Sequence, residues 1–314
     1  MKSIFRHLQF GPRAGGRPPV AVELSPGGVL AAVSAGPGQA PASAYEPLPQ
    51  GSLVPGIAET NLRAPEAVAN AIRAALGQLA PRSRALTLIL PDNVVRVFLL
   101  DFDSLPARAA EAVPILRFRL RKMVPFDVER AGVGYQILVE GKTECKALAA
   151  VIPAPVLEEY ENLVRQAGYE PGAVLSSSLA ALAAIDSTDP VLVASLSAQT
   201  LTTLIAQGQN LLLYRTLELP GDRGRWIEEL RRGVRMAAAY YEDRLGVCPS
   251  LLYYAGAGRD GIGAAEEFAR LLDGTGPSGF AVADLSPRPA SGAANPQGNQ
   301  ISLAGVTGAL AGVA

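Results

Sequence analysis

Histidine and cysteine are nearly absent from this sequence of 314 residues, which has one His and two Cys. A hydrolase built on Ser-His-Asp or Cys-His groups, and a zinc site built on imidazole, both need a histidine within a folded segment. His7 instead lies in a stretch rich in Gly, Pro and Arg, and Cys145 and Cys248 form no C-x-x-C motif. The sequence therefore argues against most hydrolases and zinc enzymes. The two cysteines are expected to be buried thiols in a reducing compartment. With so few His and Cys, any bound metal is expected to be a hard cation held by carboxylates or by a ligand's phosphates.

Net charge and long apolar runs are also scarce. The 28 basic and 29 acidic side chains leave a formal charge of −1, unlike the basic surface of a nucleic-acid binder. No run reaches the roughly 18 apolar residues that a membrane span requires. Residues 1–19 combine four cations with several Pro and Gly, so we expect a flexible basic leader rather than a signal peptide. The alternative for this leader is weak attraction to an anionic membrane surface. Without a membrane span or a signal peptide in the sequence, we expect the protein in the cytoplasm.

The length favours two domains, and one hydrophobic pattern occurs twice. Residues 20–33 are typical of two strands around a Ser-Pro-Gly-Gly turn, and residues 191–205 are typical of a second strand, turn and strand. A shift of 172 positions maps the first hairpin onto the second: Glu23 to Ser195, Leu24 to Leu196, Ser25 to Ser197 and Val29 to Leu201. This offset predicts a duplicated α/β unit with a cleft between two lobes.

The stretch between the two hairpins contains a strand and a basic helix. Residues 85–90 predict a buried strand that ends at Pro91, and residues 94–100 are expected to be its hairpin partner. Residues 106–122 predict a basic amphipathic helix. Its cations are Arg108, Arg117, Arg119, Arg121 and Lys122. This excess of positive charge fits either a solvated helix face or contact with an anionic partner surface or membrane headgroups.

Small residues at the two hairpin turns suggest a phosphate site. Backbone N–H groups that point outward from such a turn form a nest for phosphate oxygens, and glycines after a later strand let an adenosine approach the backbone. The candidate nucleotide-binding residues are Glu23, Ser25, Gly27, Gly28, Ser195, Ser197, Gly256 and Gly258. The alternative is that these are ordinary hairpin turns, in which Gly and Ser are common.

The order of these parts resembles the PilM family. The resemblance rests on the two hairpins, on the stretch from Leu86 to Phe126 with its Lys-Met-Val-Pro-Phe segment, and on Tyr-Ala-Gly-Ala-Gly at 254–258. PilM proteins are actin-like cytoplasmic proteins of type IV pilus assembly and relatives of the cell-division protein FtsA. The resemblance implies an α/β fold of the actin-like bilobal kind, with duplicated RNase H-like units and an inserted subdomain of the FtsA and PilM type.

The resemblance also implies how the chain is divided. The expected segments are a flexible basic leader at 1–19, the N-terminal part of the first lobe at 20–84, the inserted subdomain at 85–165, a return to the first lobe and crossover at 166–190, the second lobe at 191–285, a linker at 286–300 and a C-terminal helix at 301–314.

The phosphate turns depart from the family pattern. Family members usually have Asp-x-Gly at both turns and a lysine shortly after the first. Here Glu23 replaces the first acid, Leu30 stands where the lysine is expected, and Ser195 replaces the second acid. ATP with Mg²⁺ is the implied cofactor, but hydrolysis needs those acids and that lysine to organise Mg²⁺ and neutralise phosphate charge. We therefore expect a scaffold that is not an enzyme. It would be a pseudo-ATPase, which can still bind ATP but has lost the ability to hydrolyse it.

The family resemblance implies a membrane-bound partner. PilM-like proteins bind the N-terminal cytoplasmic tail of PilN, a single-span inner-membrane protein, in a groove beside the inserted subdomain. The implied location is the cytoplasmic side of the inner membrane, with peripheral contact only, and self-association is a further expectation. The candidate partner-binding residues are Leu88, Leu90, Val95, Val97 and Phe126, which are either groove floor or core beneath it. The alternatives are an active actin-like ATPase or kinase and the cytoplasmic part of a type II secretion L-type protein.

Overall fold

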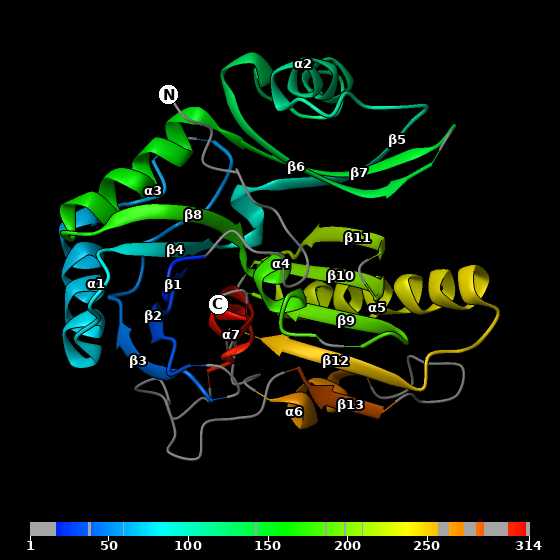
Figure 1. Cartoon of the computed structure of the whole chain (residues 1–314). Coiled ribbons are helices and arrows are strands. Elements are labelled where there is room, and N and C mark those ends of the chain that lie inside the picture. Colours follow the sequence, from blue (N-terminus) through cyan, green and yellow to red (C-terminus); the bar gives the residue numbers. More distant parts are fainter. Residues whose placement is uncertain are drawn as a thin grey trace.

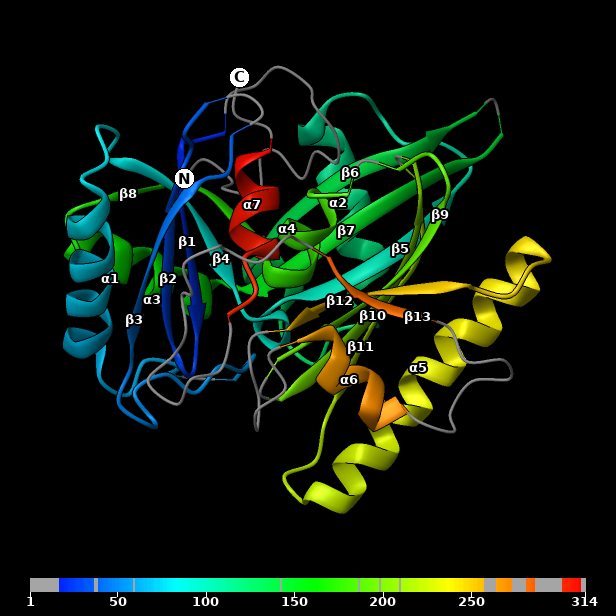
Figure 2. The ribbon, with the colours of Figure 1, turned by 90° about the horizontal axis from the view of Figure 1, so that it is seen from below.

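The computed structural model describes residues 17–36, 39–58, 60–141, 143–185, 187–197, 199–208, 210–256, 264–272, 281–285 and 301–311. These residues form two five-stranded sheets and one three-stranded sheet, each with its own helices (Figure 1). Seen from the second direction, the two five-stranded sheets lie on either side of a short helix pair (Figure 2). The expected linker at 286–300 and the first sixteen residues of the leader lie outside the described residues.

The first lobe is built on a sheet with strand order β3-β2-β1-β4-β8. Its strands are β1 (Val20–Ser25), β2 (Gly28–Val33), β3 (Ala42–Pro47), β4 (Ala85–Leu90) and β8 (Glu170–Ser176). The helices α1 (Pro65–Leu79) and α3 (Ala154–Gln166) cover one face. Proline stands in the first turn of both helices, where a missing N–H costs no hydrogen bond. Strands β1 and β4 run parallel and are buried on both faces, as expected for the centre of a sheet.

The second lobe repeats this plan with strand order β11-β10-β9-β12-β13. Its strands are β9 (Pro190–Leu196), β10 (Thr200–Gln207), β11 (Asn210–Glu218), β12 (Leu251–Gly256) and β13 (Ala281–Asp284), and its helices are α5 (Arg223–Leu245) and α6 (Ala265–Leu272). Helix α5 begins where the Asp222 carboxylate accepts a hydrogen bond from the Arg225 N–H. It ends at Gly246, whose φ of +72° suits glycine.

The predicted duplication is present in the strand register. Glu23 pairs with Leu30 across the first hairpin, and the shift of 172 positions leads to Ser195 and Thr202, which pair across the second hairpin. In both sheets the hairpin continues into a third antiparallel strand on one side and two parallel strands on the other. The two sheets therefore have the same topology, not only similar hairpins.

The inserted subdomain is smaller than the range 85–165. It consists of β5 (Arg96–Phe102), α2 (Ala109–Leu120), the 3₁₀ turn η2 (Val128–Arg130), β6 (Ala131–Glu140) and β7 (Cys145–Pro153), with sheet order β5-β7-β6. The prediction that 85–90 and 94–100 form a hairpin is wrong, because β4 pairs with β1 and β8 whereas β5 pairs with β7. The 3₁₀ turn η1 (Asp92–Val94) redirects the chain between the two sheets.

The two short helices α4 (Ser177–Leu182) and α7 (Ala304–Leu310) pack against each other between the lobes (Figure 2). Gly308 makes this approach possible: a Cβ there would lie 1.9 Å from the Ala180 carbonyl oxygen. The C-terminal helix that the sequence predicts within 301–314 is present as α7, which spans Ala304–Leu310.

The leader boundary at residue 19 also needs correction, because its last residues are packed. Arg17 donates a hydrogen bond of 3.1 Å to the Gly308 carbonyl, and Pro18 lies so close to Gly172 that a Cβ there would come within 2.7 Å of its ring. Residues 17–19 therefore belong to the first lobe. Among the helices of the described residues, none is both long and apolar enough to cross a bilayer.

Candidate functional site

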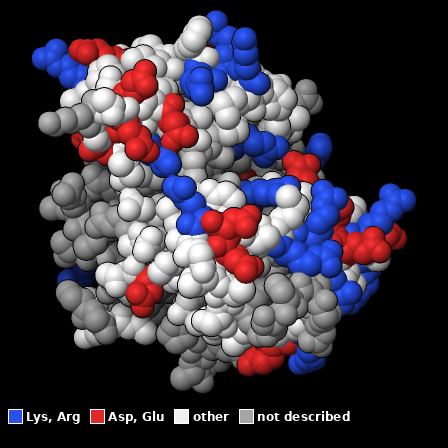
Figure 3. All heavy atoms as spheres, turned by 90° about the vertical axis from the view of Figure 1, so that its right-hand side faces the viewer, with Lys and Arg blue, Asp and Glu red and all other residues white. Residues whose placement is uncertain are grey.

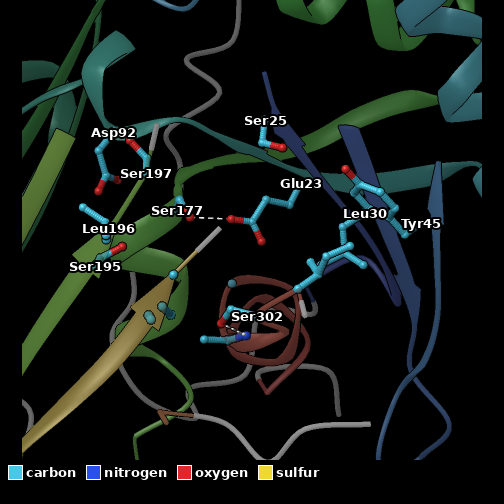
Figure 4. A pocket seen from close by; sticks show the side chains of 16 residues that line it. Glu23, Ser25, Leu30, Tyr45, Asp92, Ser177, Ser195, Leu196, Ser197 and Ser302 are labelled. Carbon is cyan, nitrogen blue, oxygen red and sulfur yellow. Dashed lines mark hydrogen bonds between the residues drawn. The ribbon is translucent and has the colours of Figure 1, made fainter. Parts of the chain in front are cut away.

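A pocket of about 600 Å³, counting the space open to solvent, lies between the two lobes where the hairpin turns meet (Figure 4). It is lined by Glu23, Ser25, Leu30, Tyr45, Asp92, Ser177, Ala181, Ser195, Leu196, Ser197, Ala255, Gly256, Ile301, Ser302, Ala304 and Gly305. Strands β1, β9 and β12 and the two helices α4 and α7 all contribute residues. The pocket thus lies at the interlobe position where the sequence predicts a nucleotide site.

The structure brings most of the predicted nucleotide-binding residues together. Five of the eight line the pocket: Glu23, Ser25, Ser195, Ser197 and Gly256. Gly27 and Gly28 belong to the first hairpin turn without lining the pocket, and Gly258 lies outside the described residues.

The first turn uses its own polar groups internally. The Ser25 hydroxyl accepts a hydrogen bond of 3.2 Å from the Gly28 N–H and donates one of 3.1 Å to the Gly28 carbonyl. The Tyr45 hydroxyl donates a bond of 2.7 Å to the Gly27 carbonyl, and a Cβ at Gly28 would lie within 2.3 Å of that hydroxyl oxygen. Gly28 is therefore required for Tyr45 to cover the turn, and its N–H is occupied.

The second turn has the same arrangement 172 positions later. The Ser197 hydroxyl accepts hydrogen bonds from the Thr200 N–H at 3.1 Å and from the Gln199 N–H at 3.3 Å. The Ser197 N–H in turn donates a hydrogen bond of 2.9 Å to the Thr200 carbonyl. These N–H groups do not form the outward-facing nest that the small residues suggested, so a phosphate that used them would have to displace a serine hydroxyl.

Glu23 is one of the two carboxyl groups that line the pocket. It accepts a hydrogen bond from the Ser177 hydroxyl at the start of α4. It also lies against the backbone of α7, where a Cβ at Gly305 would be 2.4 Å from its Oε2. Burial raises the pKa of Glu23 to about 7; the Ser177 bond opposes the rise and the charge of Asp92 adds to it. This carboxyl therefore keeps its proton to a much higher pH than an ordinary glutamate does.

Asp92 is a site residue that the sequence analysis missed. It stands two positions after the last residue of β4 and is 4% exposed. Its Oδ1 accepts bonds of 3.0 Å and 2.9 Å from the N–H and hydroxyl of Ser178, and its Oδ2 accepts one of 2.7 Å from the hydroxyl of Thr202. Burial raises the pKa of Asp92 against these bonds. The signal that could have found it is an acid just past the carboxyl end of a strongly apolar strand, where open α/β sheets bind their ligands.

Asp92 and its neighbours join the two lobes. Thr202 lies on β10 of the second lobe, and the Ser178 hydroxyl is 2.7 Å from the Tyr214 hydroxyl on β11. The Asn93 side-chain amide donates a hydrogen bond of 2.9 Å to Gln199 Oε1 in the second turn. We call Asp92, Asn93 and their partners the interlobe clasp. The clasp holds the lobes together through the protein's own side chains.

The pocket is acidic in character. Among its lining residues Glu23 and Asp92 are carboxyl groups, and none is Lys or Arg. A triphosphate in this pocket would meet acids without a compensating cation from the lining. No group of three or more His, Cys, Asp or Glu side chains suited to a metal ion occurs in the part of the chain that the structure describes.

The five candidate partner-binding residues do not form one groove. Leu88, Leu90 and Val95 are 0%, 0% and 3% exposed and belong to the core of the first lobe, so a partner cannot contact them in this state. Val97 and Phe126 are partly buried. Val97 packs against the first-lobe core and Phe126 against the core under α2, on opposite faces of the three-stranded sheet.

No protein-family model matches this sequence, and no curated protein matches it. Among solved structures, a chain of the PilM-PilN type IV pilus biogenesis complex is similar with a TM-score of 0.70 and 20% identity, over 94% of this chain and 98% of that chain. The cytoplasmic domain of EpsL, an inner membrane component of the type II secretion system of Vibrio cholerae, aligns with a TM-score of 0.47 and 14% identity, over 76% and 81%. A Bacteroides thetaiotaomicron protein with an actin-like ATPase fold and unknown function aligns with a TM-score of 0.46 and 12% identity, over 81% and 87%.

The likeness to the PilM-PilN chain confirms the predicted fold. The 6% of this chain left uncovered is much shorter than the inserted subdomain, so most of that subdomain is matched as well. The chain has the actin-like bilobal fold with a subdomain inserted in its first lobe.

Proposed function

We propose that this chain is an actin-like scaffold of a type IV pilus assembly platform, located on the cytoplasmic side of the inner membrane. In this role it binds the short cytoplasmic tail of a PilN-like single-span membrane protein. The observation that carries the proposal is the likeness to the PilM-PilN chain across both lobes and the insert. A likeness limited to one lobe would be expected of many actin-like proteins, whereas this one extends over almost the whole of both chains.

The partner's tail is expected to bind beside the inserted subdomain as an extended segment. Two of its strands, β5 and β6, lie at the edges of the three-stranded sheet, and an extended peptide can add to such an edge through backbone hydrogen bonds. The residues of the contact are not the buried leucines of β4, because these form the core of the first lobe.

A peptide-binding experiment tests the scaffold role. Fluorescently labelled peptides with the N-terminal tails of single-span membrane proteins encoded next to this gene would be titrated with the full chain. We expect saturable binding of one such tail in the micromolar range and none of a scrambled peptide of the same composition. If no neighbouring tail binds better than its scrambled control, the proposal fails.

We also propose that the interlobe pocket does not hydrolyse ATP. Four features support this: the N–H groups of Gly28 and Thr200 are bonded to Ser25 and Ser197, the lining has no cation, burial raises the pKa of Glu23, and Asp92 is engaged in the interlobe clasp. Hydrolysis requires groups that neutralise the charge developing on the phosphate and a positioned water. The proposal is compatible with ATP binding as long as the bound ATP is not hydrolysed.

Calorimetry with Mg-ATP and a phosphate-release assay test this second part. We expect no release above that of a Glu23→Ala variant, with or without heat of binding. Turnover that appears in the wild-type chain and disappears in Glu23→Ala would reject the proposal.

A further inference from the structure

Helix α2 has apolar side chains on both of its faces. Ala112, Leu116 and Leu120 are fully buried against the three-stranded sheet. On the outer face, Phe118 is 75% exposed and Ile115 is 40% exposed, and Met123, just after the helix, is 43% exposed. Phe118 has the greatest exposed fraction among the large apolar residues that the structure describes. Phe118 and Ile115 stand three positions apart and therefore on one face of the helix. Together with Met123 beyond its end, we call them the outer apolar patch.

The outer apolar patch lies in a basic part of the described chain. Residues 108–130 contain six cations and three acids: Arg108, Arg117, Arg119, Arg121, Lys122 and Arg130 against Glu111, Asp127 and Glu129. The chain as a whole carries −1, whereas this segment carries +3, as do residues 223–235 of α5. Its cations are densest at 117–122, where four of six residues are Arg or Lys and none is acidic.

The acids of this segment are already engaged. Glu111 pairs with Arg108 at 3.7 Å, and Glu129 pairs with Arg121 at 2.6 Å. Asp127 accepts a bond of 3.0 Å from the Glu129 N–H. Arg119 and Lys122 are exposed and have no ion pair within the described residues, so they leave positive charge beside the outer apolar patch.

The patch faces away from the rest of the molecule. Helix α2 is the outermost element at the end opposite the second lobe (Figure 1). The space-filling view shows Lys and Arg at that end beside Asp and Glu, and a second group of Lys and Arg lower on the same face (Figure 3). The helix therefore presents its outer face without obstruction from either lobe.

We propose that the outer face of α2 rests on the surface of an anionic lipid bilayer, with Phe118, Ile115 and Met123 among the headgroups and acyl chains. An interfacial helix has this composition: aromatic and aliphatic side chains flanked by Arg and Lys. Arg119 and Lys122 reach anionic headgroups with their charged ends while their stems lie along the apolar surface. A bilayer accepts a projecting helix face, whereas an acidic peptide would need a pocket for its side chains. The inference rests on the proposed function only in that the proposed partner brings the chain to a membrane.

Vesicle sedimentation tests the proposal. The full chain would be mixed with vesicles of phosphatidylcholine containing 30% phosphatidylglycerol or of phosphatidylcholine alone. We expect binding to the anionic vesicles, weakened by raising the salt concentration, and little binding to the neutral ones. The double variant R119E/K122E is expected to bind about tenfold or more weakly, and Phe118→Ser several-fold more weakly.

A matched control comes from α5. Arg225 and Arg235 are exposed there, so R225E/R235E makes the same change of charge far from α2. This control is expected to bind vesicles as the wild type does. Because every substituted side chain is exposed, all variants should keep the melting temperature of the wild type. Absence of binding to anionic vesicles, equal loss in the α5 control, or no loss in R119E/K122E would each overturn the proposal.

Two further measurements separate this inference from others. If the wild-type chain binds an acidic peptide but not vesicles, and R119E/K122E abolishes that binding, the face serves a protein and the lipid proposal is wrong. The same variants are expected to bind the membrane-protein tail with unchanged affinity. A chain that binds vesicles through α2 but binds no tail would contradict the proposed function and leave this inference standing.

Discussion

The Asp92 carboxylate and the Thr202 hydroxyl form a hydrogen bond of 2.7 Å that connects the two lobes. Asp92 stands at the end of β4 in the first lobe, and Thr202 stands on β10 in the second. In a nucleotide-dependent actin-like protein, a bound nucleotide can bridge the lobes. Here the interlobe clasp supplies a bridge from the chain itself, which is consistent with a scaffold that keeps one arrangement of its lobes.

The first prediction compares two buried threonines. Thr202→Val removes a donor to a buried carboxylate, so we expect the free energy of unfolding to fall by about 2 kcal/mol. Thr87 is also 0% exposed, but its hydroxyl has no hydrogen-bond partner within the described residues. Thr87→Val keeps the shape and removes an unsatisfied polar group, so we expect a gain of about 1 kcal/mol. Urea unfolding measures both, and a loss of equal size in the two variants would contradict the assigned role of Thr202.

The second prediction concerns the exposed link between the lobes. Arg96 pairs with Glu218 at 3.1 Å, but the Glu218 side chain is 72% exposed. Exposed ion pairs contribute little because water and salt screen them. We therefore expect Glu218→Gln to change the free energy of unfolding by less than about 0.5 kcal/mol. A loss as large as that of Thr202→Val would mean that this exposed pair holds the lobes as strongly as the Asp92 hydrogen bond does.

The third prediction uses the pKa of Glu23. The folded state raises this pKa from 4.5 to about 7, so the folded state binds the proton more tightly than the unfolded state does. The contribution of Glu23 to stability is therefore most favourable below pH 4.5 and is lost progressively as the pH rises from about 4.5 to about 7. The full difference is at most about 3 kcal/mol.

Glu23→Gln tests that dependence, because glutamine stays neutral and its carbonyl can still accept the bond from Ser177. We expect the variant to match the wild type near pH 4.5 and to be the more stable of the two at pH 7.5. Unfolding curves at several pH values between 4.5 and 7.5 give the difference directly. Two curves that run parallel over this range would show that Glu23 is not the group whose protonation is linked to folding.

The duplicated hairpins could be predicted from the sequence because their signal is local. Each consists of two apolar strands around a turn of small residues, and the offset of 172 positions carries Ser25 to Ser197. What the serines do could not be predicted. Whether a hydroxyl points into a pocket or back to its own turn depends on the turn geometry, and both serines bond back to the turn.

The misassigned strand and the missed acid have a non-local cause. The apolar run of β4 shows that it is buried, but its partner residues in β1 lie 66 positions earlier, as in the pair Ala21 and Thr87. Strand β5 begins only a few residues after β4 and therefore suggests a hairpin. Asp92 looks like the residue that ends a strand, because its partner Thr202 lies 110 positions away in the other lobe. Burial can be read from local composition, but the choice between two sheets depends on contacts that composition does not encode.

The fourth prediction compares two helix glycines. In α7, a Cβ at Gly308 would lie 1.9 Å from the Ala180 carbonyl oxygen and 2.8 Å from the Ala184 nitrogen, both of them backbone atoms. Gly308→Ala must therefore push α7 away from α4, and we expect a loss of about 3 kcal/mol, at the upper end of what overpacking costs. In α1, a Cβ at Gly77 would meet nothing within 4 Å. Gly77→Ala adds only helix propensity, so we expect a gain of about 0.5–1 kcal/mol.

Chemical denaturation of both variants measures these opposite effects of the same substitution. Because α7 also lies against the carboxyl group of Glu23, Gly308→Ala should alter the pH dependence of stability, while Gly77→Ala should shift the curve without changing its shape. A Gly308→Ala protein as stable as the wild type would show that α4 and α7 do not pack as closely as described. The lobes would then owe their arrangement to the Asp92 hydrogen bonds rather than to this helix pair.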